Sequence, residues 1–124
     1  MRFTKGHLRL SHKEIWNAGH HLASCIYDGL LQFKNSERVS YPVDLTAEKW
    51  DERLDKMLFS FKEILTQYKN DPIELYFNKL QNSGERDLKK FKAPDEICEE
   101  SKKYYKDIKE GLNLFSKYYM DLWD

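Results

Sequence analysis

The chain has 124 residues, 40% of them apolar and 34% charged, which suits one helical domain with its own core. Its 21 basic residues match its 21 acidic ones, and this balance is unusual for a general nucleic-acid or membrane-surface binder, because such proteins are usually basic. No apolar run approaches the roughly 18 residues that a membrane-spanning helix needs, and the N-terminus has no apolar signal core. Cys25 and Cys98 are therefore interpreted as reduced thiols of a cytoplasmic protein.

Residues 1–10 form a short basic stretch, for which we expect a frayed arm. Four basic residues precede Glu14, the first acidic one. They are candidate contacts for an anion or a nucleic acid: Arg2, Lys5, Arg9 and Lys13.

The first predicted helix covers residues 11–33. It starts at a capping box, in which the Ser11 hydroxyl accepts the Glu14 amide proton and the Glu14 carboxylate reaches back to the Ser11 amide. Gly19 and Gly29 each lower helix propensity by about 1 kcal/mol relative to alanine, so we expect another helix to pack closely there. The apolar stripe consists of Ile15, Gly19, Leu22, Ile26, Leu30 and Phe33.

Two further helices are predicted over residues 46–69 and 72–81. Thr46 is placed to cap the first, and Asp71-Pro72 begins the second with a capping acid and a proline at the first helical position. Apolar residues in the longer helix recur at steps of four and three, at Trp50, Leu54, Met57, Phe61, Ile64 and Tyr68.

The last helix is predicted over residues 94–123, and a heptad seam runs along it. A second seam lies beside the first, so this helix can contact two others. Its excess length also makes a homodimer possible. The first seam consists of Ile97, Ser101, Tyr104, Ile108, Gly111, Phe115, Tyr118 and Leu122, and the second of Cys98, Tyr105, Leu112 and Tyr119.

These patterns predict an all-α fold in a single domain, residues 1–124. It is expected to be a small bundle of three long helices and one short helix, with the C-terminal helix as its spine.

Two clusters of polar residues within 20–28 could in principle form a metal site or supply a general base. His21, Cys25 and Asp28 have metal-ligand spacing on one stripe, but a fourth ligand would have to come from a distant residue such as His7 or Cys98. His20 and His21 could supply a general base, yet no nucleophile accompanies them. Solvated side chains are the favoured interpretation of both clusters, and no cofactor, metal or catalytic residue is predicted.

Carboxylate pairs invite comparison with all-helical nucleotide pyrophosphohydrolases, which bind magnesium through ExxE and ExxD motifs on facing helices. Residues 96–99 match ExxE, while 48–51 and 52–55 match ExxD. Their order along the chain is wrong for that family. Each acid also has a simpler role at a helix start or in a pair with Lys or Arg, so this interpretation is weak.

Several apolar residues lie off the predicted stripes. Isolated exposed apolar residues are normal, but a cluster of them would form a docking surface. Together with the aromatic C-terminus, the candidate partner-binding residues are Phe59, Leu75, Leu31, Leu114 and Trp123.

Two segments resemble a small, uncharacterised protein family of tailed bacteriophages and prophages. They are 45–57, LTAEKWDERLDKM, and 110–119, EGLNLFSKYY, the latter followed by Leu122-Trp123-Asp124. Trp16, His21-Leu22-Ala23 and the glycine before Leu30 fit as well, so the resemblance covers most of the chain apart from 67–103. It implies a phage or prophage origin and action in the host bacterial cytoplasm, but it assigns no activity or catalytic residue.

We expect a non-enzymatic phage accessory protein of the host-takeover or anti-defence type, which binds a host or phage protein. The alternative is a helical domain that binds nucleic acid or nucleotide, suggested by the basic arm and the lysines near Lys89.

Overall fold

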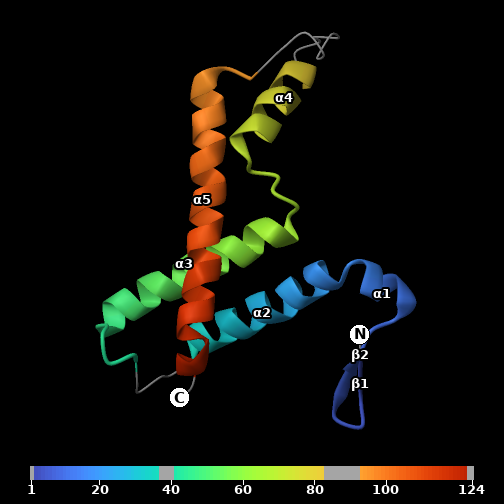
Figure 1. The fold of residues 1–124 in the computed structure, drawn as a ribbon, viewed down its shortest axis with the longest axis vertical. Helices are drawn as coiled ribbons and strands as arrows, with labels where there is room; N and C mark the ends of the chain where they lie inside the picture. Colours follow the sequence, from blue (N-terminus) through green and yellow to red (C-terminus); the bar gives the residue numbers. More distant parts are fainter. Residues whose placement is uncertain (1, 37–40, 83–92, 123–124) are drawn as a thin grey trace.

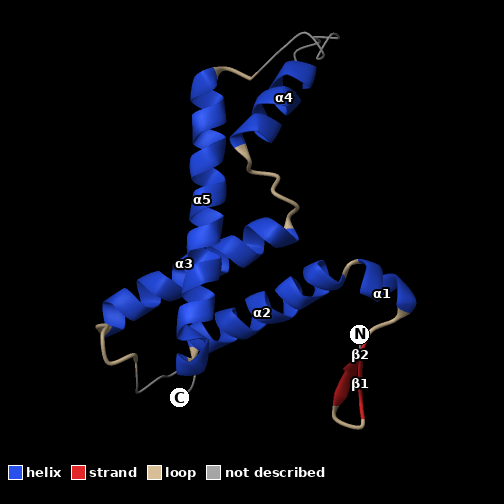
Figure 2. Ribbon diagram, viewed as in Figure 1, coloured by secondary structure: helices blue, strands red, loops and turns tan. Residues whose placement is uncertain are grey.

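The chain is built from amphipathic helices, as the hydrophobic spacing predicts. The computed structural model describes residues 2–36, 41–82 and 93–122. Within them an all-α fold follows a small N-terminal β-ribbon (Figures 1 and 2). The elements are β1 (Arg2–Thr4), β2 (His7–Arg9), α1 (His12–Trp16), α2 (Ala18–Asn35), α3 (Ala47–Leu65), α4 (Pro72–Asn82), α5 (Asp95–Tyr118) and the 3-10 turn η2 (Tyr119–Asp121). None of the helices in these ranges has the length and apolar composition needed to cross a membrane.

Helix α3 holds the core together. Both α2 and α5 pack on it, while α2 and α5 do not pack on one another within the described ranges. The side chains of Trp50, Leu54 and Met57 are at most 2% exposed, because their stripe is covered on both sides. This core is therefore a layer of three helices with α3 in the middle, and α2 and α5 diverge on either side of it (Figure 1).

The first predicted seam of α5 is its buried face. Ser101, Ile108, Gly111 and Tyr118 are the buried residues of the helix, and all four belong to that seam. Gly111 marks the closest approach to α3, since a Cβ there would lie 1.9 Å from Ser60 Oγ. Ser60 Oγ donates a hydrogen bond to the Ile108 carbonyl at 2.7 Å, which ties the two helices together at this crossing.

The first half of α5 extends beyond the core and has α4 beside it (Figure 1). None of the residues of α4 is fully buried, because α5 is the only helix it packs on in the described part of the chain. As the sequence predicts, α5 thus contacts two other helices. It packs on α4 along its first half and on α3 along its second half.

Three predicted helices differ from their predicted bounds. The last one ends at Tyr118, before residue 123, and is followed by the 3-10 turn η2. The first predicted helix is divided at Asn17, whose φ and ψ are −115° and 35° and whose amide donates to the Glu14 carbonyl at 3.1 Å. The second ends at Leu65, before residue 69, because Gln67 and Tyr68 have φ of 56° and 58° and leave the right-handed region.

The expectation of a frayed N-terminal arm is wrong for the backbone. Strands β1 and β2 pair antiparallel, with Arg2 opposite Arg9 and Thr4 opposite His7. Lys5 and Gly6 form the two-residue turn, with φ of 52° and 77°. Positive φ at both positions is typical of a type I′ turn, whose twist matches that of the strands it joins. The Lys5-Gly6 pair was the sequence signal for this ribbon.

Candidate interaction surface

An apolar groove with a volume of about 290 Å³ lies between α2 and the C-terminal end of the chain's last helices. It is open to solvent, and none of the residues that line it carries a charge. Helix α2 contributes four of them, and the others come from the end of α5 and the segment after it: Ile26, Gly29, Leu30, Phe33, Phe115, Tyr119 and Leu122.

The groove exists because α2 presents more apolar surface than α3 can cover. Ala23 and Leu30 are buried against the core, whereas Leu22, one turn before the groove-lining Ile26, remains 49% exposed. Across the groove, Tyr119 is 62% exposed. A Cβ built on Gly19 or Gly29 would meet no atom within 4 Å. The close helix packing expected at these glycines is therefore not provided by the described part of this chain.

The described off-stripe residues predicted to bind a partner lie on four different helices. Phe59 and Leu114 line two different depressions. Leu31 is 37% exposed on α2 and Leu75 is 50% exposed on α4, while Leu114 packs partly against the core. Trp123 lies outside the described residues. Sequence spacing identified three exposed apolar side chains but missed the groove, because its two walls come from distant segments.

Phe59 sits in a depression of about 440 Å³ where α3 crosses α5, and the rest of its lining is charged: Glu52, Asp55, Lys56, Asp107 and Glu110. The ring is 37% exposed and rests edge-on against Tyr104, with 6.3 Å between the ring centroids. Lys56 Nζ donates to Glu110 Oε1 at 2.9 Å, and this hydrogen bond lowers the pKa of the Glu110 carboxyl. The depression is polar around one aromatic ring, unlike the groove.

The histidines considered as general bases lie around a polar hollow of about 410 Å³, together with Lys13 and Gln67. The ring centroids of His20 and His21 are 5.9 Å apart, in an edge-on arrangement. Gln67 reaches this hollow from the turn after α3. Ser11, Glu14 and Asn17 complete the lining. The Ser11 hydroxyl accepts the Glu14 amide proton at 3.2 Å, so this serine serves as a helix cap.

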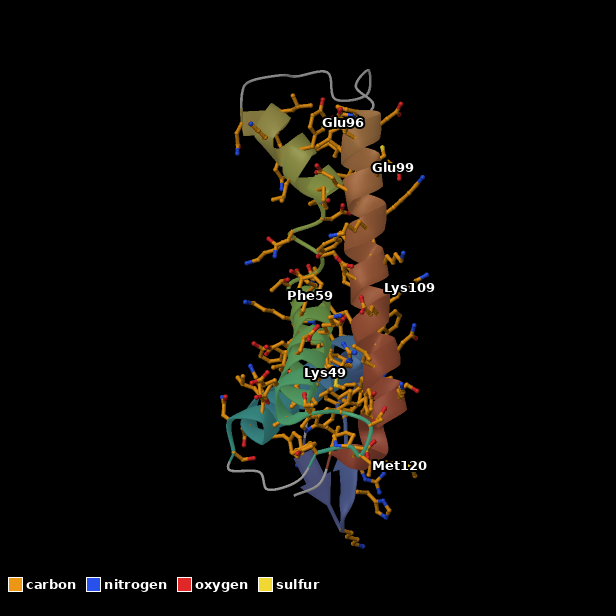
Figure 3. All side chains as sticks on the ribbon, turned by 90° about the vertical axis from the view of Figure 1, so that its left-hand side faces the viewer. Lys49, Phe59, Glu96, Glu99, Lys109 and Met120 are labelled. Atoms are coloured by element: carbon orange, nitrogen blue, oxygen red, sulfur yellow. The ribbon has the colours of Figure 1, made fainter. Side chains whose placement is uncertain are left out.

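Within the described ranges, no group of three or more histidine, cysteine or acidic side chains could hold a metal ion. The carboxylate motifs are also far apart. Figure 3 places Glu96 and Glu99 near the outer end of α5, whereas Lys49, inside the motif of residues 48–51, lies well below them, in the lower half of the view. The facing-helix arrangement of a magnesium site is therefore not formed between these two motifs.

Two carboxylates and two tyrosines join α3, α4 and α5 where the chain turns after α3. Glu63 is 5% exposed, and it accepts hydrogen bonds from Tyr104 Oη at 3.0 Å and from Asn70 Nδ2 at 3.0 Å. Asp71 accepts from Ser101 Oγ at 2.7 Å and, through its other oxygen, from Tyr105 Oη at 2.9 Å.

These contacts change the ionisation of the tyrosines. Burial, and then the hydrogen bond to Asp71, raises the pKa of Tyr105 to about 12. Burial and the bond to Glu63 raise the pKa of Tyr104 as well. Ser101 and Tyr105 also line an open depression of about 590 Å³ between α4 and α5. Because the hydrogen bonds themselves join three helices, we interpret the network as a structural clamp on the left-handed turn at Gln67 and Tyr68.

The candidate anion contacts are exposed, as a ligand would need. Arg2 and Arg9 face each other across the ribbon, Lys5 is in its turn, and Lys13 is in α1. The lysines near Lys89 lie outside the described residues.

Comparisons with known protein families, curated proteins and solved structures give no match to this chain.

Proposed function

We propose that this protein is not an enzyme and that it acts by binding an amphipathic helix of another protein in the groove between α2 and the end of α5. The observation that carries the proposal is a face of α2 that the described part of the chain covers only in part. Leu22 is 49% exposed and the Cβ positions of Gly19 and Gly29 are open, next to Ile26 and Phe33, which also pack against the core. These five residues follow one another at steps of three and four, the spacing with which one helix packs against another.

Several features of the groove favour a helix as its occupant. Its walls are two helices that both rest on α3, so a further helix would complete a four-helix arrangement. The open space over Gly19 and Gly29 permits a close approach of backbones. Since the lining is uncharged, binding would depend on apolar anchors at i, i+3, i+4 and i+7 of the incoming helix.

The resemblance to tailed-phage proteins suggests which partner to test. On that basis the helix belongs to a host or phage protein, and binding takes place in the cytoplasm of the bacterial host. A host-takeover or anti-defence role is the form of action that this resemblance favours.

The test is affinity isolation from infected cells, followed by calorimetry with the purified partner and with peptides that span its helices. A Gly29→Trp variant fills the groove, and it should fold normally because no atom lies within 4 Å of the new Cβ. We expect it to weaken binding by at least about 100-fold, as expected when an apolar anchor site is blocked. Asp28→Trp, an exposed neighbour in the same helix that does not line the groove, is the matched control.

Three results would contradict the proposal. Gly29→Trp could bind the partner as well as the parent does. Phe59→Asp alone could abolish binding, which would place the contact at the α3–α5 crossing. Sedimentation could show a dimer that Gly29→Trp dissociates, and the occupant would then be a second copy of this chain.

A further inference from the structure

The charges of this chain are segregated, although they sum to zero. Four of its 21 basic residues and none of its 21 acidic residues lie among residues 1–13, so this segment carries a charge of +4 and the rest of the chain carries −4. The four are Arg2, Lys5, Arg9 and Lys13. The neutral total therefore conceals a strongly basic patch at one end of the molecule.

The fold gathers this charge instead of dispersing it. Arg2 and Arg9 are directly opposite in the antiparallel ladder, so both side chains leave the same face of the ribbon. Lys5 lies in the turn that forms the ribbon's tip. In the described part of the chain, no carboxylate forms an ion pair with any of these three residues.

The ribbon also stands apart from the helices. Its strands pack on each other, and in the described ranges neither packs on any helix (Figure 1). An isolated two-stranded hairpin is only marginally stable in water, and like charges directly opposite destabilise it further. A polyanion would remove that repulsion, so binding and ordering of the ribbon would favour each other.

We infer that this ribbon, with Arg2, Lys5 and Arg9 as its charged groups, is a contact for the phosphate backbone of duplex DNA, to which Lys13, four residues after Arg9 in α1, adds a further positive charge. Guanidinium groups form paired hydrogen bonds with phosphate oxygens. The major groove of B-form DNA, about 12 Å wide, admits a two-stranded ribbon, whereas the major groove of duplex RNA is too narrow for side chains to enter. The contact would be independent of base sequence, since arginines and a lysine directed at phosphates read no base edge.

The experiment is fluorescence anisotropy of a labelled 20-base-pair DNA duplex titrated with the full chain at several salt concentrations. With up to four phosphate contacts, we expect weak binding at about 50 mM salt, with a logarithmic salt slope of roughly −2 to −4. Arg2→Glu combined with Arg9→Glu should weaken binding by at least about tenfold and should reduce the slope by about 2. Duplex RNA of the same sequence should bind more weakly than the DNA.

The matched control combines Lys106→Glu with Lys109→Glu. It changes the net charge by the same amount, but on the exposed face of α5, where Lys109 points away from the core (Figure 3). We expect it to retain most of the binding. Equal losses in the two double variants would overturn the inference, because whole-molecule charge would then explain the binding.

Two other results would also overturn it. One is no binding of DNA by the parent at about 20 mM salt. The other is tighter binding to phosphatidylserine-containing vesicles than to DNA, which would assign the ribbon to a membrane surface. The ribbon variants leave the α2–α5 groove intact, so failure here is distinguishable from failure of helix docking.

Discussion

Replacing Gly111 with alanine tests the close contact between α3 and α5. The new Cβ would lie 2.3 Å from the Lys56 carbonyl oxygen and 2.8 Å from Ser60 Cβ, where ordinary contacts begin at 3.4 Å. Because one of these atoms is backbone, α3 and α5 must move apart by about 1 Å. We estimate about 3 kcal/mol for this overpacking and about 1 kcal/mol for the lost bond from Ser60 to Ile108, offset by about 1 kcal/mol of helix propensity. The expected loss of unfolding free energy is about 3 kcal/mol.

Urea denaturation followed by circular dichroism measures this loss, and the melting temperature should fall by about 12 °C for a chain of this size. Gly29→Ala is the control, since it gains the same propensity in open space and should stabilise the fold by about 0.5 to 1 kcal/mol. Adding Ser60→Gly to Gly111→Ala should recover only part of the loss, because the Lys56 carbonyl remains in the way. A Gly111→Ala protein as stable as the parent would refute the α3–α5 crossing described here.

Two further predictions concern the network at the end of α3. The raised pKa of Tyr105, about 12 against an ordinary value of 10.0, means that the folded state favours the neutral phenol. Its contribution to stability is complete below pH 10 and is lost as the pH rises from 10 towards 12, so melting temperatures should fall over that range, and less so in Tyr105→Phe. Absorbance at about 295 nm should show Tyr104 and Tyr105 ionising above the ordinary tyrosine pKa of about 10. Glu63→Ala leaves the donors of Tyr104 and Asn70 without their acceptor and should cost about 2 to 3 kcal/mol in urea denaturation, whereas Glu63→Gln should cost less. Equal stability of the two Glu63 variants would show that the hydrogen bonds contribute little.

The helices could be predicted from the sequence because their signals are local. The Ser11 and Thr46 caps form the predicted hydrogen bonds, and the step of four and three residues along α3 and α5 identifies the faces that are buried. The ends of these helices were harder to place. Glu63 and Asn70 hold the turn after α3 together across seven residues, and no propensity scale includes such a contact.

The surfaces could not be predicted in the same way, because each combines segments that are distant in the sequence. Phe59 and Leu75 were identified as exposed, yet the groove is lined by residues such as Ile26 and Phe115, which the sequence assigns to seams. An apolar seam predicts that another helix packs on it, but it does not show whether that helix belongs to the same chain or to another protein. The ribbon was missed because its strands have only three residues each, too few to show an alternating pattern.

The affinity of the purified partner for the Gly29→Trp variant is the most direct test of helix docking in the groove. A tryptophan there blocks the α2 wall without meeting any atom of the folded chain within 4 Å of its Cβ. We predict a melting temperature near that of the parent together with a loss of affinity of at least about 100-fold, while Asp28→Trp binds normally. Parent-like affinity in the folded Gly29→Trp protein would show that the groove is not where the partner binds.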